Sequence, residues 1–216
     1  NELSGKDWIN GLNRIKTNSE LPITISGGEP TLHQDFYEII QGIDKATPID
    51  LLTNLQFSIK EFTAKVDPKR LQRQAKYASI RVSYHPNRHK YETLLTQVRY
   101  LMNKGYSVGI WGVDHPDYSE HVKYVQYEAQ NLGIDFRIKE FLGWHMGELY
   151  GTYRYPHALL GNKAPVMCKT SELLIGPDGN IYRCHRDLYS NSNIIGNILS
   201  SEDLPLNTYI RCNKYG

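Results

Sequence analysis

A glycine pair followed by a carboxylate and a proline is the part of the sequence best suited to holding a ligand. Gly27-Gly28-Glu29-Pro30 follows a β-branched run at residues 23–25 that predicts a short strand. The glycines allow backbone angles that a Cβ would forbid, and they let a ligand come close. Pro30 favours an extended Glu29, which gives its carboxylate a defined direction. A ligand amine could be held there, and an ordinary strand-to-helix turn is the alternative interpretation.

Three cysteines, Cys168, Cys184 and Cys212, offer soft thiolate ligands of the kind that hold iron–sulfur clusters. Three cysteines cannot form a closed set of disulfides, so metal binding and free thiols are the two options. Pro-Asp-Gly within residues 176–179 predicts a hairpin, which would bring Cys168 and Cys184 toward one end. Three unrelated buried thiols are the alternative.

The elements that must position these residues alternate between helix and strand up to about residue 143. Strands are predicted at residues 23–25, 49–53, 79–83, 107–113 and around 136–141. Apolar side chains at helical spacing separate them, most clearly Phe36, Ile39, Ile40 and Ile43. Repeated strand–helix units predict an α/β fold with a parallel sheet, helices outside it and a tendency to curl toward a barrel.

With its flanking strand and helix, the segment 27–30 resembles the second-strand motif of radical S-adenosylmethionine (radical SAM) enzymes. In that family the motif binds the amino group of the SAM methionine, so the resemblance implies that Gly27, Gly28, Glu29 and Pro30 bind SAM. It also implies a partial (β/α)6 TIM-like barrel in which the predicted strands are the second to the sixth. Asn54 and Ser83, at the ends of the next two strands, would contact SAM or substrate, with an ordinary turn role as the alternative.

The radical SAM family holds a 4Fe-4S cluster on a Cys-x3-Cys-x2-Cys loop after its first strand. No cysteine precedes Cys168, and no strand is predicted before residue 23. We expect the first strand and the cluster loop to lie upstream of Asn1, and a degenerate relative that has lost the cluster is the alternative. This stretch of chain alone is therefore not expected to generate the radical.

The cysteine-rich end resembles the SPASM and twitch domains that follow many radical SAM barrels and bind auxiliary clusters. Ten residues separate Cys168 from Gly179 and four separate Gly179 from Cys184, similar to the Cys-x9–15-Gly-x4-Cys opening of such domains. The resemblance implies that Cys168, Cys184 and Cys212 ligate an auxiliary 4Fe-4S cluster. The fourth position would be open, would be filled by a residue such as His185 or Asp187, or would lie beyond the end of the sequence.

Three segments are expected: a partial radical SAM barrel at 1–143, a connector at 144–165 and a hairpin-containing, cysteine-rich extension at 166–216. The resemblance implies an oxidoreductase or maturase that cleaves SAM to a 5′-deoxyadenosyl radical and abstracts hydrogen from a substrate, with peptides as the best single choice. An electron donor such as flavodoxin or ferredoxin is an implied partner. Two alternatives stay open: a non-catalytic scaffold that binds a peptide or protein and uses its cysteines structurally or with zinc, and an unrelated barrel enzyme whose glycine turn takes a phosphate.

Composition adds bounds on the class of protein. The 216 residues, of which 40% are hydrophobic, can bury a proper core. A net charge of +2 argues against a dedicated nucleic-acid partner. No apolar run is long enough to span a membrane and no signal peptide is visible, so a cytoplasmic location is expected.

Histidines give a weaker signal. His85 and His115 follow predicted strand ends, where a substrate-facing or proton-transfer role is an option. His85 and His89 are spaced for two ligands on one helix, but Pro86 disfavours a regular helix there and no third ligand of suitable spacing accompanies them. The sequence therefore predicts no zinc site at these histidines.

Overall fold

The computed structural model describes residues 2–16, 21–153, 159, 165–169, 172–205 and 208–212. The chain divides into two compact units. One is Lys16–Thr152, and the other combines Asn1–Ile15 with Tyr153–Gly216.

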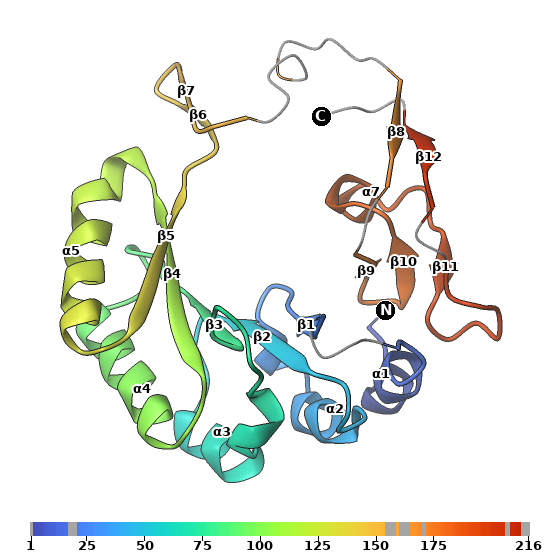
Figure 1. Cartoon of the computed structure of the whole chain (residues 1–216), viewed down its shortest axis with the longest axis horizontal. Coiled ribbons are helices and arrows are strands. Elements are labelled where there is room, and N and C mark those ends of the chain that lie inside the picture. The colour runs from blue at the N-terminus through green and yellow to red at the C-terminus, as the bar shows by residue number, and fades with distance from the viewer. Residues whose placement is uncertain are drawn as a thin grey trace. The chain divides into compact units, whose positions relative to one another are not determined.

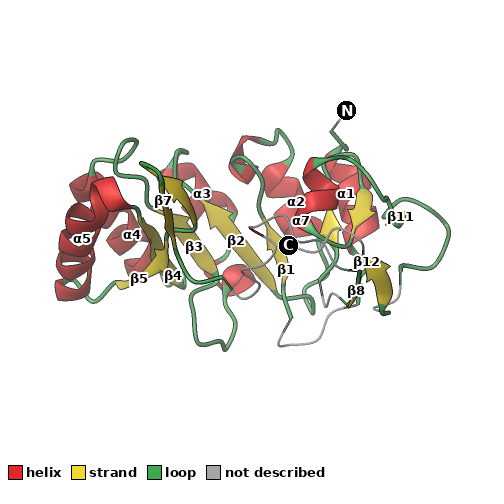
Figure 2. Ribbon diagram, turned by 90° about the horizontal axis from the view of Figure 1, so that it is seen from above, coloured by secondary structure: helices red, strands yellow, loops and turns green. Residues whose placement is uncertain are grey.

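A five-stranded parallel sheet is the centre of the unit Lys16–Thr152. The strands have the same order in space as in the chain: β1 (Ile23–Ile25), β2 (Ile49–Thr53), β3 (Ile80–Ser83), β4 (Val108–Asp114) and β5 (Asp135–Glu140). Figure 2 shows these strands side by side. The predicted α/β class and parallel strand order are confirmed, and the sheet is compatible with a partial TIM-like fold.

Helices connect consecutive strands of this sheet. They are α2 (Phe36–Gly42), α3 (Ile59–Lys65), α4 (Tyr91–Asn103) and α5 (Ser119–Asn131), with the 3-10 turns η1 (Pro30–Leu32), η2 (Pro68–Leu71) and η3 (Pro116–Tyr118). The four helices lie outside one face of the curved sheet (Figure 1). No helix in the described part of the chain is long and apolar enough to cross a membrane.

Apolar side chains fill the space between the sheet and its helices. The predicted helical stripe is buried, with Ile40 of α2 completely enclosed. Leu51 of β2, Ile110 of β4 and Val122 of α5 are also inaccessible to solvent. Because each such side chain contributes about 1.5–3 kcal/mol on burial, this layer supplies the main stabilisation of the unit.

One carboxylate lies inside this core. Asp50 of β2 is fully buried and accepts two hydrogen bonds from Arg73, from Nε to Oδ1 at 2.8 Å and from Nη2 to Oδ2 at 2.9 Å. Arg81 Nη2 lies 3.4 Å from the same Oδ2. The hydrogen bonds that Arg73 donates to Asp50 raise the pKa of the Arg73 guanidinium above its usual range, so Arg73 stays charged.

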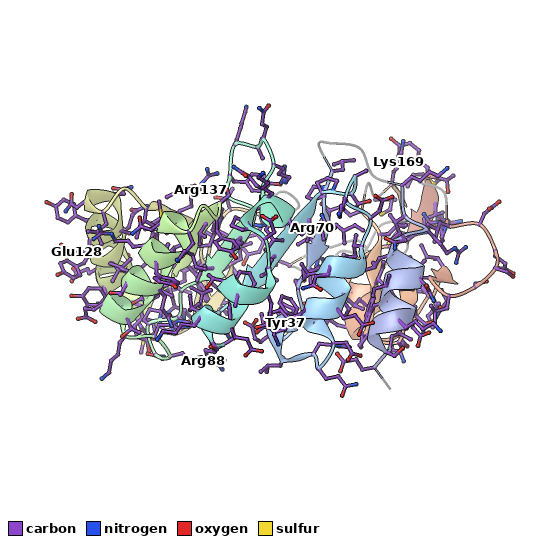
Figure 3. The ribbon with its side chains drawn as sticks, turned by 90° about the horizontal axis from the view of Figure 1, so that it is seen from below. Tyr37, Arg70, Arg88, Glu128, Arg137 and Lys169 are labelled. Carbon is purple, nitrogen blue, oxygen red and sulfur yellow. The ribbon has the colours of Figure 1, made fainter. Side chains whose placement is uncertain are left out.

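A second arginine closes the carboxyl end of α2. Arg70, labelled in Figure 3, donates to four backbone carbonyls at the end of the helix and in the loop after it, those of Ile40, Ile43, Asp44 and Thr47. Burial lowers the pKa of Arg70. Its guanidinium satisfies carbonyls that the helix itself leaves without partners.

A small β hairpin follows β5, in residues that the sequence assigns to the start of an irregular connector. It pairs β6 (Gly143–His145) with β7 (Glu148–Tyr150). Its two turn residues, Met146 and Gly147, both have left-handed backbones with φ of 48° and 85°. That combination is typical of a type I′ turn, and the missing Asn or Asp at its first position explains why the sequence gives no hairpin signal.

The second unit contains small antiparallel sheets. Strands β9 (Leu174–Ile175), β10 (Asn180–Tyr182) and β11 (Gly196–Asn197) form one sheet in the order β11-β10-β9, and β8 (Val166–Cys168) pairs with β12 (Ile210–Cys212). The short helix α7 (His185–Tyr189) follows β10. The predicted Pro-Asp-Gly turn joins β9 to β10, where the Gly179 backbone is left-handed at φ 80°.

The N-terminal helix α1 (Gly5–Leu12) belongs to this second unit. A Cβ on Gly11 would lie 2.5 Å from Ile198 Cδ1, so only glycine permits this close packing. Arg14 donates to the carbonyls of Ile198, Ser200 and Glu202. The sequence prediction groups the same helix with the barrel segment 1–143. The predicted boundaries around the connector stay a prediction, because residues 154–158 and 160–164 lie outside the described part.

Candidate functional site

The turn after β1 is open. Gly27 has a φ of 156°, and apart from the chain neighbours no atom of the described residues lies within 4 Å of a Cβ built on Gly27 or on Gly28. Both glycines are exposed, at the carboxyl end of a strand in a parallel sheet. This edge is where parallel α/β sheets bind ligands, so the turn offers exposed backbone to an incoming group.

The carboxylate of Glu29 is turned toward its own chain. Its Oε1 accepts from Thr31 N at 3.3 Å and Thr31 Oγ1 at 2.7 Å, and its Oε2 accepts from Asn54 N at 2.7 Å. The Thr53 hydroxyl lies 2.9 and 3.0 Å from the two oxygens. A carboxylate has about four acceptor positions, and these four donors use them. Glu29 therefore ties the glycine turn to the end of β2.

Asn54 and Ser83 lie at the same edge of the sheet. The Asn54 side chain accepts a hydrogen bond from the Gln56 backbone at 2.9 Å, and the Asn54 backbone carbonyl lies 3.0 Å from His89 Nε2. Ser83 ends β3 opposite Trp111 of β4. The structure thus joins Asn54 to Glu29 through the backbone. It also shows Thr53, the residue directly before Asn54, as a positioning residue for the same carboxylate.

Aromatic and imidazole groups follow β3. Tyr84 is buried, and its hydroxyl lies 2.8 Å from His121 Nε2. Burial, chiefly, raises the pKa of Tyr84, so the phenol stays protonated. Burial lowers the pKa of His85, and the neighbouring charges of His89 and Arg88 add to that effect. His85 is thus held neutral beside the edge that carries Ser83.

The cysteines come together in the second unit. In the β8–β12 ladder Cys168 lies opposite Ile210, two positions from Cys212, and no disulfide joins these described cysteines. Burial raises the pKa of the Cys168 thiol, and a hydrogen bond with Cys212 and the charges of Cys212 and Cys184 raise it further. Three thiols from separate segments therefore share one locality.

The spacing of these sulfurs bears on which metal group they fit. A single zinc ion with Zn–S bonds of about 2.3 Å holds its sulfurs about 3.8 Å apart. Among the described residues, one group of metal-type ligand atoms lies mutually within 4.8 Å, and it contains none of the three cysteines. A four-iron cluster binds each thiolate to a different iron and separates the sulfurs more widely. Thiolate donors suit an iron–sulfur cluster, and the three sulfurs do not form a group in which all lie within 4.8 Å of one another.

The group within 4.8 Å consists of His115, Asp117 and His145. His115 is the one member that the sequence singles out, as a histidine after a strand end. Asp117 sits in η3, and His145 ends β6. Nothing in the spacing links His145 to the other two, because it reaches them only through the β6–β7 hairpin.

No model of a protein family and no curated protein matches the chain. Among solved structures, the chain is similar to Streptococcus suis SuiB, a radical SAM-type protein, with a TM-score of 0.50 and 16% sequence identity. The match covers 94% of this chain and 58% of SuiB, so the chain spans little more than half the length of that protein. This likeness supports a radical SAM-related fold.

Proposed function

We propose that this protein is a radical SAM-type maturase whose cysteine-rich segment holds an auxiliary iron–sulfur cluster. The observation that carries the proposal is the gathering of Cys168, Cys184 and Cys212, in a chain with the fold of a radical SAM-type protein. The partial (β/α)6 barrel is the finer description of the sheet unit under this proposal.

The open turn after β1 is the proposed binding site of the SAM methionine. The exposed backbone of Gly27 and Gly28 would bind the amino group, and Pro30 and Glu29 would hold the turn in the conformation that binds it. Asn54 and Ser83, at the same sheet edge, would contact SAM or the substrate. With a cluster of the radical SAM type, bound SAM supplies a 5′-deoxyadenosyl radical that abstracts hydrogen.

The substrate class proposed is a peptide or protein side chain. The auxiliary cluster would accept an electron from the substrate radical or help to position the substrate. A small electron carrier such as flavodoxin or ferredoxin would deliver reducing electrons.

His185 and Asp187 are the two candidates for the fourth ligand of the auxiliary cluster. His185 is exposed at the start of α7, directly after Cys184, and its ring lies 6.0 Å from that of Tyr189. Asp187 already accepts a hydrogen bond from Asn193 at 2.8 Å. Of these two residues we propose His185, because Asp187 would have to give up its present bond.

Anaerobic reconstitution of the chain with iron and sulfide tests the auxiliary cluster. We expect a broad cluster absorbance, with iron and acid-labile sulfide bound in similar amounts. Cys168→Ser and Cys184→Ser should lose both. Met167→Leu is the matched control, because it removes the sulfur of an exposed neighbour in the same strand.

Two results would overturn the assignment. One is an iron content that does not change in Cys184→Ser. The other is a stoichiometric zinc content without labile sulfide, which would favour a non-catalytic scaffold with structural cysteines.

A further inference from the structure

Two histidines and one carboxylate meet at the carboxyl end of β4. His115 directly follows β4, Asp117 lies two residues on in η3, and His145 comes from the β6–β7 hairpin. His145 Nε2 is 3.0 Å from Asp117 Oδ1, and His115 Nδ1 is 3.8 Å from Asp117 Oδ2. One ligand atom from each of the three residues lies within 4.8 Å of the others.

These separations are close to those of ligands on one metal ion. With metal–nitrogen distances of about 2.0–2.1 Å, two ligands on a tetrahedral or octahedral ion are about 2.9–3.4 Å apart. The His145–Asp117 pair already has this distance, and the His115 nitrogen is within a small side-chain rotation of it.

Aromatic packing holds the two imidazoles in place. The His115 ring centroid lies 4.5 Å from that of Phe141 and 4.9 Å from that of His145. The His145 ring packs against Tyr150 at 6.1 Å, across the hairpin. His145 is the most enclosed of the three, with 19% of its side chain exposed, compared with 30% for His115 and 51% for Asp117. Aromatic side chains thus cover the site on the side of the two imidazoles, and the site is open to solvent on the side of Asp117.

The His115 ring also accepts a hydrogen bond within the turn. Its Nδ1 accepts the Asp117 backbone N–H at 3.2 Å, which caps η3. Ligation through either ring nitrogen gives up this bond, because a metal-bound imidazole carries its proton on the other nitrogen. This hydrogen bond is long at 3.2 Å, and without it the turn η3 still keeps the Asp117 carboxylate beside the His115 ring.

We propose that His115, Asp117 and His145 bind a divalent transition metal ion of the zinc or iron(II) type. Imidazole nitrogens favour such ions, whereas magnesium and calcium favour all-oxygen sites. Two histidines and one carboxylate leave coordination positions open, so a bound ion can take an oxygen or nitrogen atom of a substrate. This site shares no residue with the proposed cysteine cluster, and it does not depend on the proposed function.

Zinc titration of the 216-residue chain, followed by histidine side-chain NMR, tests the site. We expect one equivalent of zinc to shift the ring signals of His115 and His145 and to leave those of His85 and His89 in place. Asp117→Asn and His145→Gln should each weaken zinc binding about tenfold or more, since each removes one of three ligands. Asp114→Asn is the matched control, because it makes the same change on β4 outside the group.

The cysteines also attract zinc, and the NMR measurement separates the two sites. Zinc that binds only to the cysteines leaves the signals of His115 and His145 unchanged and remains bound in Asp117→Asn, and this result would overturn the proposal. Equal affinity of wild type and Asp117→Asn at the histidines would overturn it as well. Circular dichroism identifies a misfolded variant, in which case His115→Gln provides the same test.

Discussion

Replacing Glu29 by glutamine tests whether the Glu29 carboxylate stabilises the glycine turn or binds SAM. The substitution keeps the size of the side chain but replaces one carboxylate oxygen by an NH2 group. Four donors from Thr31, Thr53 and Asn54 surround the two oxygens. In glutamine, one of these donors must face another donor.

The expected loss can be worked out from these contacts. The Thr53 hydroxyl can rotate to the remaining oxygen, but the Asn54 N–H, now 2.7 Å from Oε2, is fixed by the backbone. A hydrogen bond to a charged acceptor contributes about 1.5–3 kcal/mol, so Glu29→Gln should lower the free energy of unfolding by about 2–3 kcal/mol. For a chain of this size that corresponds to about 5–10 °C in Tm.

Thermal unfolding measures the total effect, and amide hydrogen exchange locates it. The Asn54 amide should lose protection in Glu29→Gln, and amides of β4 should not. Glu128→Gln is the control, because Glu128 lies on the outer side of α5 (Figure 3) and its substitution should cost less than about 0.5 kcal/mol. Unchanged stability of Glu29→Gln together with weaker SAM binding would refute the reasoning, since the carboxylate would then serve the ligand and not the turn.

Three further outcomes are expected. Asp50→Ala should cost about 3–5 kcal/mol in urea unfolding, because Arg73 would remain charged with only 7% of its side chain exposed; a loss below about 1 kcal/mol would contradict this. Gly28→Val should unfold like Ala75→Val, since the space beside Gly28 is open, yet weaken SAM binding about tenfold or more; unchanged SAM binding would remove the turn from the site. The raised pKa of Cys168 leaves less thiolate at pH 8 than an ordinary cysteine has. Alkylation of Cys168, followed by mass spectrometry, should therefore be slower than that of a cysteine peptide, and its rate should reach a plateau at a higher pH. Equal rates would contradict the raised pKa of Cys168.

Local patterns predicted the elements that depend on neighbouring residues. The strand Ile49–Thr53 has the predicted bounds, because its apolar residues Ile49, Leu51 and Leu52 form the short run that is typical of a buried strand. The turn between β9 and β10 was predicted from Pro-Asp-Gly, whose conformational preferences are local. The parallel order followed from the alternation of strands with helices, since parallel strands need a long connection.

Long-range contacts account for what the sequence did not predict. Helix α1 packs on Ile198 through Gly11, and no local pattern of α1 records a partner so distant in the chain. The Glu29 carboxylate was expected to face a ligand, but its partners Thr53 and Asn54 come from the next strand. The same holds for His145, which meets Asp117 only because of a hairpin that the sequence did not indicate.

The proposed SAM turn and the proposed metal site lie on two strands of one sheet, and their separation bears on the substrate. The turn follows β1 and His115 follows β4, with β2 and β3 between them. At about 4.8 Å per strand, three steps place the two strand ends about 14 Å apart along the sheet. An extended peptide advances about 3.3 Å per residue, so about four residues cover this distance. A compact small molecule would reach only one of the two sites, whereas a peptide could be held at the metal while a neighbouring residue lies at the SAM turn. The strand order therefore favours a peptide among the substrates of the proposed maturase.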